Sequence, residues 1–306
     1  MTATMKTVLA SFTPGLKITW LFIFLLIGVV IAGVLTNLVL HISGAPADGG
    51  VTAIYVGSVM QSVFATALPA YLIIALTQPA PAHYLKIAGN GPIGRKMLFA
   101  VLAFLFSYFL ASYLAQLNKG MHLPSSLKEL EQTLRSMEDA ALQTSGLLLS
   151  GKGAFRLILN LVVVGGFAAV SEELFFRGAL QQFLQEKYPK GHLGVWIAAF
   201  VFSVVHFQFY GFLPRLLLGV LLGYLFLYTR TLWAPILFHF INNALIVVLY
   251  YFWGDTPWIK KMESMPAGGW LAYAAAGSAL CTFLLFGLYL RKTRRDKELQ
   301  SIWNKF

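Results

Sequence analysis

The sequence predicts an all-α, polytopic membrane helical bundle, and three observations support this fold class. Hydrophobic residues make up 58% of the 306 residues and charged residues only 11%, against about 25% charged in a soluble domain. The mean hydropathy is +0.71. The apolar residues gather into about eight runs, each near the roughly 20 residues that a helix needs to cross a bilayer.

The eight expected spans are separated by segments rich in Gly and Pro, which are typical of turns. The spans cover approximately Ile18–Leu40, Ala53–Thr77, Met97–Leu117, Phe155–Phe176, Leu193–Tyr210, Leu213–Thr229, Leu232–Phe252 and Trp270–Leu290. We divide the chain into residues 1–150 with the first three spans, a core at 151–255, and residues 256–306 with the last span and a basic tail.

The loop between the third and fourth spans is expected to contain an amphipathic helix of its own. Leu127, Leu130, Leu134 and Met137 recur at roughly helical spacing, with charged residues between them. This pattern predicts a helix that lies on the membrane surface or over a cavity. A solvated connecting helix is the alternative.

The distribution of charge predicts the topology and the partners. The net charge is +11, and the loops and tails on one side of the predicted bundle hold most of the Lys and Arg residues. By the positive-inside rule both termini are expected in the cytoplasm. Membrane lipids with anionic headgroups, and no nucleic acid, are the expected partners. The absence of eukaryotic targeting signals favours a bacterial inner membrane.

Two adjacent carboxylates, Glu172 and Glu173, lie inside the fourth expected span. A carboxylate at membrane depth costs roughly 2.5–3.5 kcal/mol on insertion scales. At about 100° per residue, Glu173 and Arg177 share one helix face and can pair, whereas Glu172 points elsewhere. Glu173 and Arg177 are therefore predicted as structural support, and Glu172 is left free to react. The alternative is that both glutamates merely neutralise Arg177.

Two later spans carry further polar residues at membrane depth. His206 is in the fifth expected span, and His239 and Asn243 stand one helical turn apart in the seventh. A histidine and an asparagine on one face can both donate hydrogen bonds to a developing negative charge. The alternative for each is helix–helix hydrogen bonding, since His and Asn commonly join membrane helices.

Together these groups predict a site that hydrolyses an amide. Glu172 and His206 can hold and deprotonate a water molecule, and His239 with Asn243 can stabilise the tetrahedral intermediate. A divalent metal such as zinc is the other option, with Glu172, His206 and His239 as three ligands and water as the fourth. No H-E-x-x-H motif is present to specify a zinc site.

The three motifs resemble those of the CPBP family, which contains the CAAX prenyl endopeptidases and bacterial proteins related to bacteriocin processing and self-immunity. Glu172-Glu173-x-x-x-Arg177, Phe202-x-x-x-His206 and His239-x-x-x-Asn243 follow one another on late spans. The resemblance covers roughly residues 157–250. It implies that residues 151–255 form the catalytic core of an intramembrane endopeptidase.

The resemblance also implies the roles of single residues. Glu172 matches the proposed general base, His206 the group that positions its water, and His239 with Asn243 the oxyanion pair. The implied substrate is a peptide or protein, lipidated or not. The metal is left open by the resemblance. A second class of function is a non-proteolytic membrane protein, either an immunity or scaffold protein or a proton-linked transporter.

Overall fold

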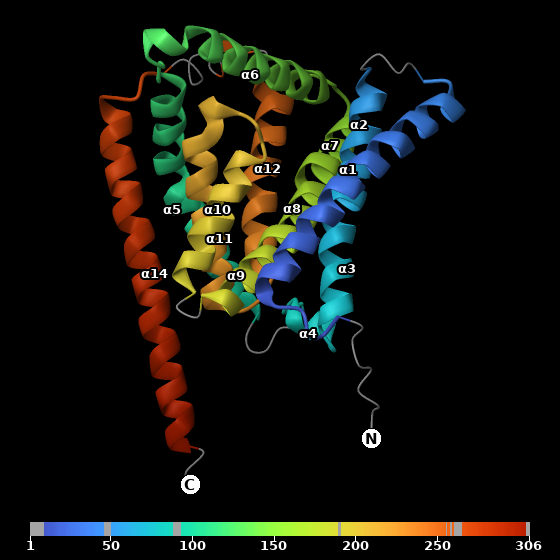
Figure 1. Ribbon diagram of the computed structural model, residues 1–306. Helices are drawn as coiled ribbons and strands as arrows, with labels where there is room; N and C mark the ends of the chain where they lie inside the picture. The colour runs from blue at the N-terminus through green and yellow to red at the C-terminus, as the bar shows by residue number, and fades with distance from the viewer. Residues whose placement is uncertain are drawn as a thin grey trace.

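The computed structural model describes residues 9–303 apart from 46–49, 88–92, 189–190, 255, 258 and 260–264, and these residues form an all-helical bundle without strands (Figure 1). The predicted all-α membrane fold is confirmed. Seven helices of the described part are long and apolar enough to cross a membrane. The fifth expected span is instead a shorter apolar helix, His192–Val204.

The first half of the chain contributes α1 (Pro14–Ser43), α2 (Val51–Met60), η1 (Gln61–Ala67), α3 (Leu68–Thr77), α4 (Pro81–Tyr84), α5 (Ile93–Lys119), η2 (Ser125–Leu127) and α6 (Lys128–Leu149). The second half contributes α7 (Ala154–Asn160), η3 (Leu161–Phe167), α8 (Ala168–Glu173), η4 (Leu174–Gln181), α9 (Gln182–Lys187), α10 (His192–Val204), η5 (Phe209–Gly211), α11 (Phe212–Thr229), α12 (Trp233–Trp253) and α14 (Trp270–Trp303).

Local sequence sets the ends of several helices. Before α1, the Thr13 side chain accepts a hydrogen bond from the Leu16 N–H, and Pro14 occupies the first helical position. Both are typical of a helix start. The helix ends at Gly44, whose φ of 66° is the left-handed conformation that glycine adopts without strain. These signals explain why α1 is longer than the apolar run alone.

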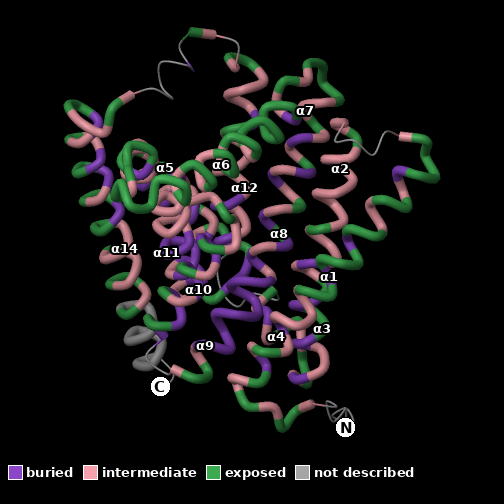
Figure 2. The backbone as a smooth tube through the Cα atoms, turned by 45° about the horizontal axis from the view of Figure 1, so that its top comes forward, coloured by how far each residue is buried: buried purple, intermediate pink, exposed green. Residues whose placement is uncertain are grey.

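Two packed halves meet along the segment α8–η4–α9. One apolar core joins η4 and α9 to α1, α3 and α10, through residues such as Leu21, Ile73 and Phe183. The other core joins α5, α11, α12 and α14, through residues such as Phe104 and Leu225. Figure 2 shows buried residues concentrated on α8, α9 and α11, whereas α1 and α14 are largely exposed. The exposed faces of α1 and α14 are apolar, as lipid-facing helices require.

Wide π-helical turns interrupt two of the long helices. One is η1, and the others, η3 and η4, flank α8 in the helix that carries Glu172 and Glu173. A π-helical turn shifts the register of a helix and is frequent at functional sites. The continuous run from Ala154 to Lys187 is longer than the fourth span predicted from the sequence.

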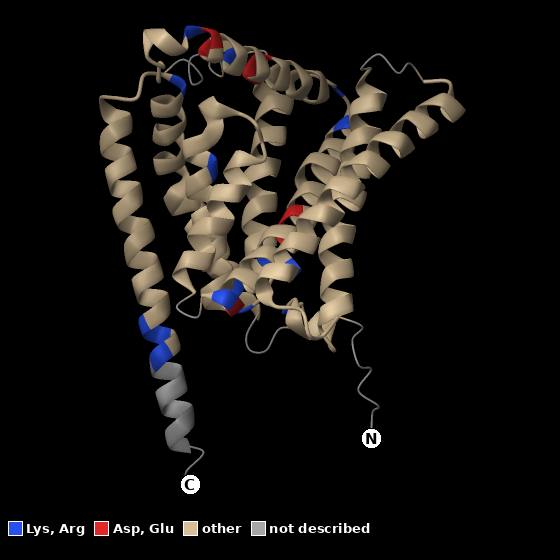
Figure 3. Ribbon diagram, in the orientation of Figure 1, with Lys and Arg blue, Asp and Glu red and all other residues tan. Residues whose placement is uncertain are grey.

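The amphipathic helix α6 is confirmed, and it lies across one end of the bundle (Figure 1). It packs against α2, α12 and the short turn η5. Figure 3 shows charged residues along α6, and a basic group near the C-terminus of α14 at the opposite end. α6 therefore covers the end of the bundle where the chain passes from α10 to α11.

Candidate active site

Glu173 and Arg177 form a buried ion pair on the α8–η4 segment. Arg177 Nη1 lies 2.7 Å from Glu173 Oε1, and the two side chains are 1% and 0% exposed. Arg177 Nη2 also donates to the Gly219 carbonyl oxygen of α11 at 3.0 Å. A buried charge needs such partners, because leaving one unpaired is strongly destabilising. The pairing predicted from the helical period is present.

Glu173 has a second partner that the sequence did not indicate. His239 Nδ1 lies 2.8 Å from Glu173 Oε1, and the ring is buried. A carboxylate on one ring nitrogen fixes the orientation of the imidazole and leaves the other nitrogen for chemistry. His239 Nε2 then faces Glu172, at 3.9 Å from its Oε2.

His206 is positioned by the turn that ends α10. Its Nδ1 lies 2.6 Å from the Phe202 carbonyl oxygen, and its Nε2 lies 3.9 Å from Glu172 Oε2. The following residue, Phe207, has a φ of 53°, a left-handed conformation that costs an L-residue about 1–2 kcal/mol. This turn is why α10 stops short of the expected span.

Glu172 is the point on which the two histidines converge. Its side chain is 23% exposed, and its Oε2 is buried without a hydrogen-bond partner. Each Nε2 is too far away for a direct hydrogen bond. A separation of this size between two polar groups suits a bridging water. With each Nδ1 donating to its own acceptor, each Nε2 can accept a hydrogen bond when its ring is neutral and donate one when its ring is protonated.

Asn243 is not joined to this group. Its amide donates to the Val164 carbonyl oxygen at 3.0 Å, and its Oδ1 accepts from Asn242 at 3.2 Å. The Val164 carbonyl belongs to the π-helical turn η3, where the register of backbone hydrogen bonds is shifted. One amide N–H of Asn243 remains for another acceptor. The structure therefore brings together Glu172, His206 and His239, whereas Asn243 is bonded to η3 instead.

Phe202 has more contacts with the site than ordinary packing predicts. Its ring centroid lies 4.8 Å from that of His206 and 6.0 Å from that of His239. The Arg177 guanidinium lies over the same ring at 4.9 Å. The side chain is buried and supports three of the site's polar groups at once. Its spacing of four residues from His206 was the signal in the sequence.

Two glycines of α11 complete the buried side. Gln181, four residues after Arg177, donates to the Gly223 carbonyl oxygen at 3.0 Å, as Arg177 does to that of Gly219. A Cβ at Gly219 would lie 2.9 Å from the Cβ of Ala199 on α10. The G-x-x-x-G spacing allows such close helix approach in membranes. This spacing was the signal that the sequence reading missed.

The described residues do not form a gathered metal site, so a metal at Glu172, His206 and His239 stays a prediction. Among them, no group of three or more His, Cys, Asp and Glu side chains is gathered as a metal site. Zinc binds nitrogen and oxygen ligands at about 2.0–2.2 Å. The Nε2 atoms of His206 and His239 each stand 3.9 Å from Glu172 Oε2, a looser arrangement than ligands that share one ion.

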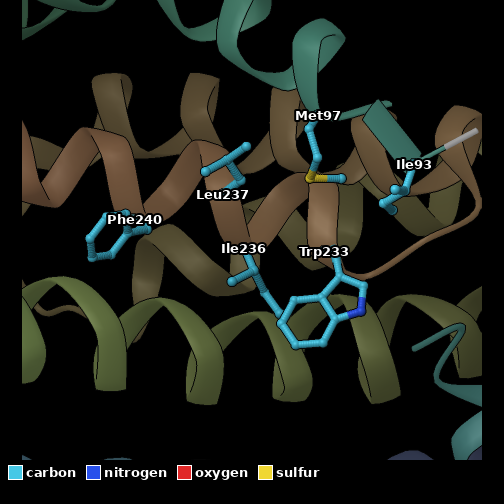
Figure 4. Close-up of a pocket in the computed structure, with 6 residues that line it drawn as sticks. All are labelled: Ile93, Met97, Trp233, Ile236, Leu237 and Phe240. Carbon is cyan, nitrogen blue, oxygen red and sulfur yellow. The ribbon is translucent and has the colours of Figure 1, made fainter. Parts of the chain in front are cut away.

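A pocket of about 470 Å³ lies between α5 and α12, and none of the site residues lines it. Ile93, Met97, Trp233, Ile236, Leu237 and Phe240 line it (Figure 4). Its walls come from α5 and from a face of α12 different from the one that carries His239. An apolar surface of this kind suits a lipid chain.

Comparisons with known proteins agree with these motifs. Residues 154–245 match the family model "Type II CAAX prenyl endopeptidase Rce1-like". A Bacillus subtilis (strain 168) protein, "Uncharacterized protein YpbD", is 30% identical over 93 residues, which are 29% of this chain and 44% of that protein. The chain thus covers under half of that relative. No solved structure matches the chain. Residues 154–245 of this integral membrane protein are therefore similar to the Rce1-like CAAX prenyl endopeptidases, in agreement with the resemblance carried by the three motifs.

Proposed function

We propose that this protein is a membrane endopeptidase that hydrolyses a peptide bond with water activated by Glu172. The observation that carries the proposal is the convergence of His206 Nε2 and His239 Nε2 on Glu172 Oε2, at 3.9 Å each. The three groups meet at one point, whereas a proton-linked transporter needs polar groups along a path. The Rce1-like match supports a protease of the CAAX type.

The chemistry follows from the free atoms. A water held between Glu172 and His206 loses a proton to Glu172 Oε2 as its oxygen attacks the peptide carbonyl carbon. His239 donates from a protonated Nε2 to the resulting oxyanion, and Glu173 balances the charge of that imidazolium. The free amide N–H of Asn243 supplies a second donor. The oxyanion then re-forms the carbonyl as the C–N bond breaks, and Glu172 gives its proton to the leaving amine nitrogen.

The substrate is proposed at the level of chemistry. A peptide or protein reaches the site within the membrane, and a lipidated peptide is consistent with the Rce1-like match. The bacterial relative supports a bacterial inner membrane. The positive-inside pattern supports cytoplasmic termini.

The test is cleavage by the purified full chain in lipid nanodiscs, followed by mass spectrometry. Farnesylated and unmodified CAAX peptides serve as probes, and peptides from membranes of cells with and without the protein widen the search. Glu172→Gln should lower the rate by about 10²–10⁴-fold, as for loss of a general base. Glu129→Gln, an exposed glutamate of α6, is the matched control. Full cleavage by Glu172→Gln would show that the base is another group.

Two measurements separate the open alternatives. Metal analysis of the purified protein, and its activity in the presence of chelators, decides between water activated by Glu172 alone and by a bound cation. A wild-type protein that cleaves neither probe and leaves the membrane peptides unchanged would support the scaffold or immunity function instead.

A further inference from the structure

Arg215 is a second arginine beside the candidate site, and its place needs an explanation. It lies in the first turn of α11, where the helix dipole disfavours a positive charge. Its guanidinium donates to the Gln208 backbone oxygen at 3.4 Å and is in close contact with the Gln208 side-chain oxygen. Neither partner carries a compensating charge.

The surroundings of Arg215 differ from those of Arg177. Within the described residues, Arg215 forms no ion pair with an Asp or Glu at 4.0 Å or less, whereas Arg177 does with Glu173. Arg215 is nevertheless held near the site, because its hydrogen-bond partner Gln208 stands two residues after His206. Charge interactions with Glu172 and His206 agree with this position. A guanidinium next to the reacting groups and without its own carboxylate is suited to bind one from a ligand.

Helix α6 carries a partly buried carboxylate, Glu138, and packs against the turn between α10 and α11. Glu138 lies within electrostatic range of Arg215, and its Oε2 is buried without a hydrogen-bond partner. Arg135, three residues earlier on the same helix face, lies over the Tyr210 ring at 4.3 Å. This contact holds that face of α6 against the turn between α10 and α11.

Gly211 makes room for the guanidinium. A Cβ at this position would overlap the Arg215 guanidinium. Any other residue would therefore displace the guanidinium from its place beside Gln208. The absence of a side chain at 211 lets the positive charge stay between the site and α6.

We propose that Arg215 binds a carboxylate of the peptide substrate, and that Glu138 of α6 competes with that carboxylate for the arginine. The inference rests on the proposed function. The planar fork of arginine matches the two oxygens of a carboxylate, and the bond to Gln208, two residues after His206, places this anion near the proposed site of cleavage. The carboxylate comes either from the C-terminus of the peptide or from an Asp or Glu side chain.

The test measures peptide binding by the full chain in nanodiscs of neutral lipid, with Glu172→Gln as the parent to prevent turnover. The probes are fluorescent libraries of apolar hexapeptides that end in a free carboxylate, in an amide, or in an amide with one internal Asp or Glu. The parent should bind carboxylate peptides about tenfold or more tightly than neutral ones, the size expected for a charge-assisted hydrogen bond. The second and third libraries distinguish the two sources of the carboxylate.

The variants should move this preference in opposite directions. Arg215→Gln should abolish it, Arg215→Lys should retain part of it, and Glu138→Gln should increase it. Asp139→Asn, the exposed neighbour on α6, and Arg156→Gln, a cation at the start of α7, are matched controls that should leave it unchanged. If Arg215→Gln does not fold, Gly211→Ala displaces the guanidinium while its charge remains, and it should weaken the preference.

Several outcomes would overturn the assignment. One is equal affinity for carboxylate and neutral peptides in the parent, and another is a preference that survives Arg215→Gln. An Arg215-dependent response to phosphatidylglycerol nanodiscs without any peptide preference would assign the arginine to lipid. Cleavage by the wild type without regard to carboxylates would keep the proposed function and reject this inference. Arg215-dependent binding without cleavage would do the reverse.

Discussion

The two faces of the α8–η4 segment differ in how their polar groups are satisfied. On the face toward α11, Glu173, Arg177 and Gln181 are all buried and bonded to neighbouring helices. On the other face, Glu172 is 23% exposed and faces His206, which is 28% exposed. One turn of helix therefore holds one carboxylate that is fixed by direct bonds and one that makes none. Pairing holds the first in place, while partial exposure leaves the second accessible to water.

Loss of the buried cation Arg177 should destabilise the protein more than any other change considered for the two faces. Arg177→Met would leave the Glu173 carboxylate buried with only His239 as a partner. Removing one member of a buried ion pair costs about 3–5 kcal/mol. We expect little folded protein and a much lower melting temperature in detergent. Arg156→Met is the control, and equal stability of the two variants would contradict the structural role of Arg177.

The two glutamates should respond differently to the same substitution. Glu172→Gln should change the free energy of unfolding by under about 1 kcal/mol, because the group is partly exposed and unpaired. Glu173→Gln should lose about 1–3 kcal/mol, because Arg177 stays buried beside a neutral amide.

Glu173→Gln should also lower activity about 10–100-fold, since Glu173 orients His239. Thermal unfolding and cleavage rates, measured on the same preparations, check both expectations. If Glu172→Gln and Glu173→Gln changed the free energy of unfolding equally, the different structural roles of the two glutamates would be contradicted.

The close approach of α11 to α10 should also contribute to the stability of the buried face that holds Glu173 and Arg177. Gly219→Leu would force its side chain against Ala199, at a cost of about 1–3 kcal/mol for an overfilled contact. The Arg177 bond to the Gly219 carbonyl would be disturbed as well. Gly33→Leu on α1, where a Cβ meets nothing within 4 Å, is the control and should be near neutral. Unfolding midpoints in detergent give the measurement.

We expect a smaller effect on the local stability of α6, the helix that lies across one end of the bundle. Hydrogen bonds from Arg135 and then from the Leu123 N–H hold the pKa of Glu131 at about 2, below its usual 4.5. A lowered folded-state pKa gives stabilisation that is present above pH 4.5 and is lost as the pH falls through 2.

Hydrogen exchange of the α6 amides, corrected for intrinsic rates, should accelerate over this pH range. Glu131→Gln should exchange faster at neutral pH and lose the acid-dependent change, whereas Asp139→Asn should behave like the wild type. Unchanged exchange in Glu131→Gln would show that α6 is held by other contacts.

Local rules of helix geometry account for what could be predicted. Composition and run length predicted the helical membrane bundle, and the apolar spacing predicted α6. The period of the helix separated Glu172 from Glu173, because Arg177 is within reach of only one of them. The order of the motifs indicated the family, and the match over residues 154–245 agrees.

Contacts between helices were outside the reach of these rules. The bond from His239 to Glu173 joins residues 66 positions apart, and that from Asn243 to Val164 joins residues 79 apart. Each depends on the relative height of two helices, which the π-helical turns shift without a clear mark in the sequence. The packing of α6 against the turn between α10 and α11, which brings Glu138 to the same end of the bundle as Arg215, also depends on contacts between helices.

Composition and residue spacing alone identify a helical protein, its place in a membrane, and the polar residues that stand out. Apolar length and helical period are local properties, and they require no knowledge of neighbouring helices. Only the tertiary structure decided which polar residues meet. It paired Glu173 with both Arg177 and His239, turned Glu172 toward His206, and left Arg215 beside the site without a carboxylate of its own. Packing set these partners, because each hydrogen bond needs two helices at one register.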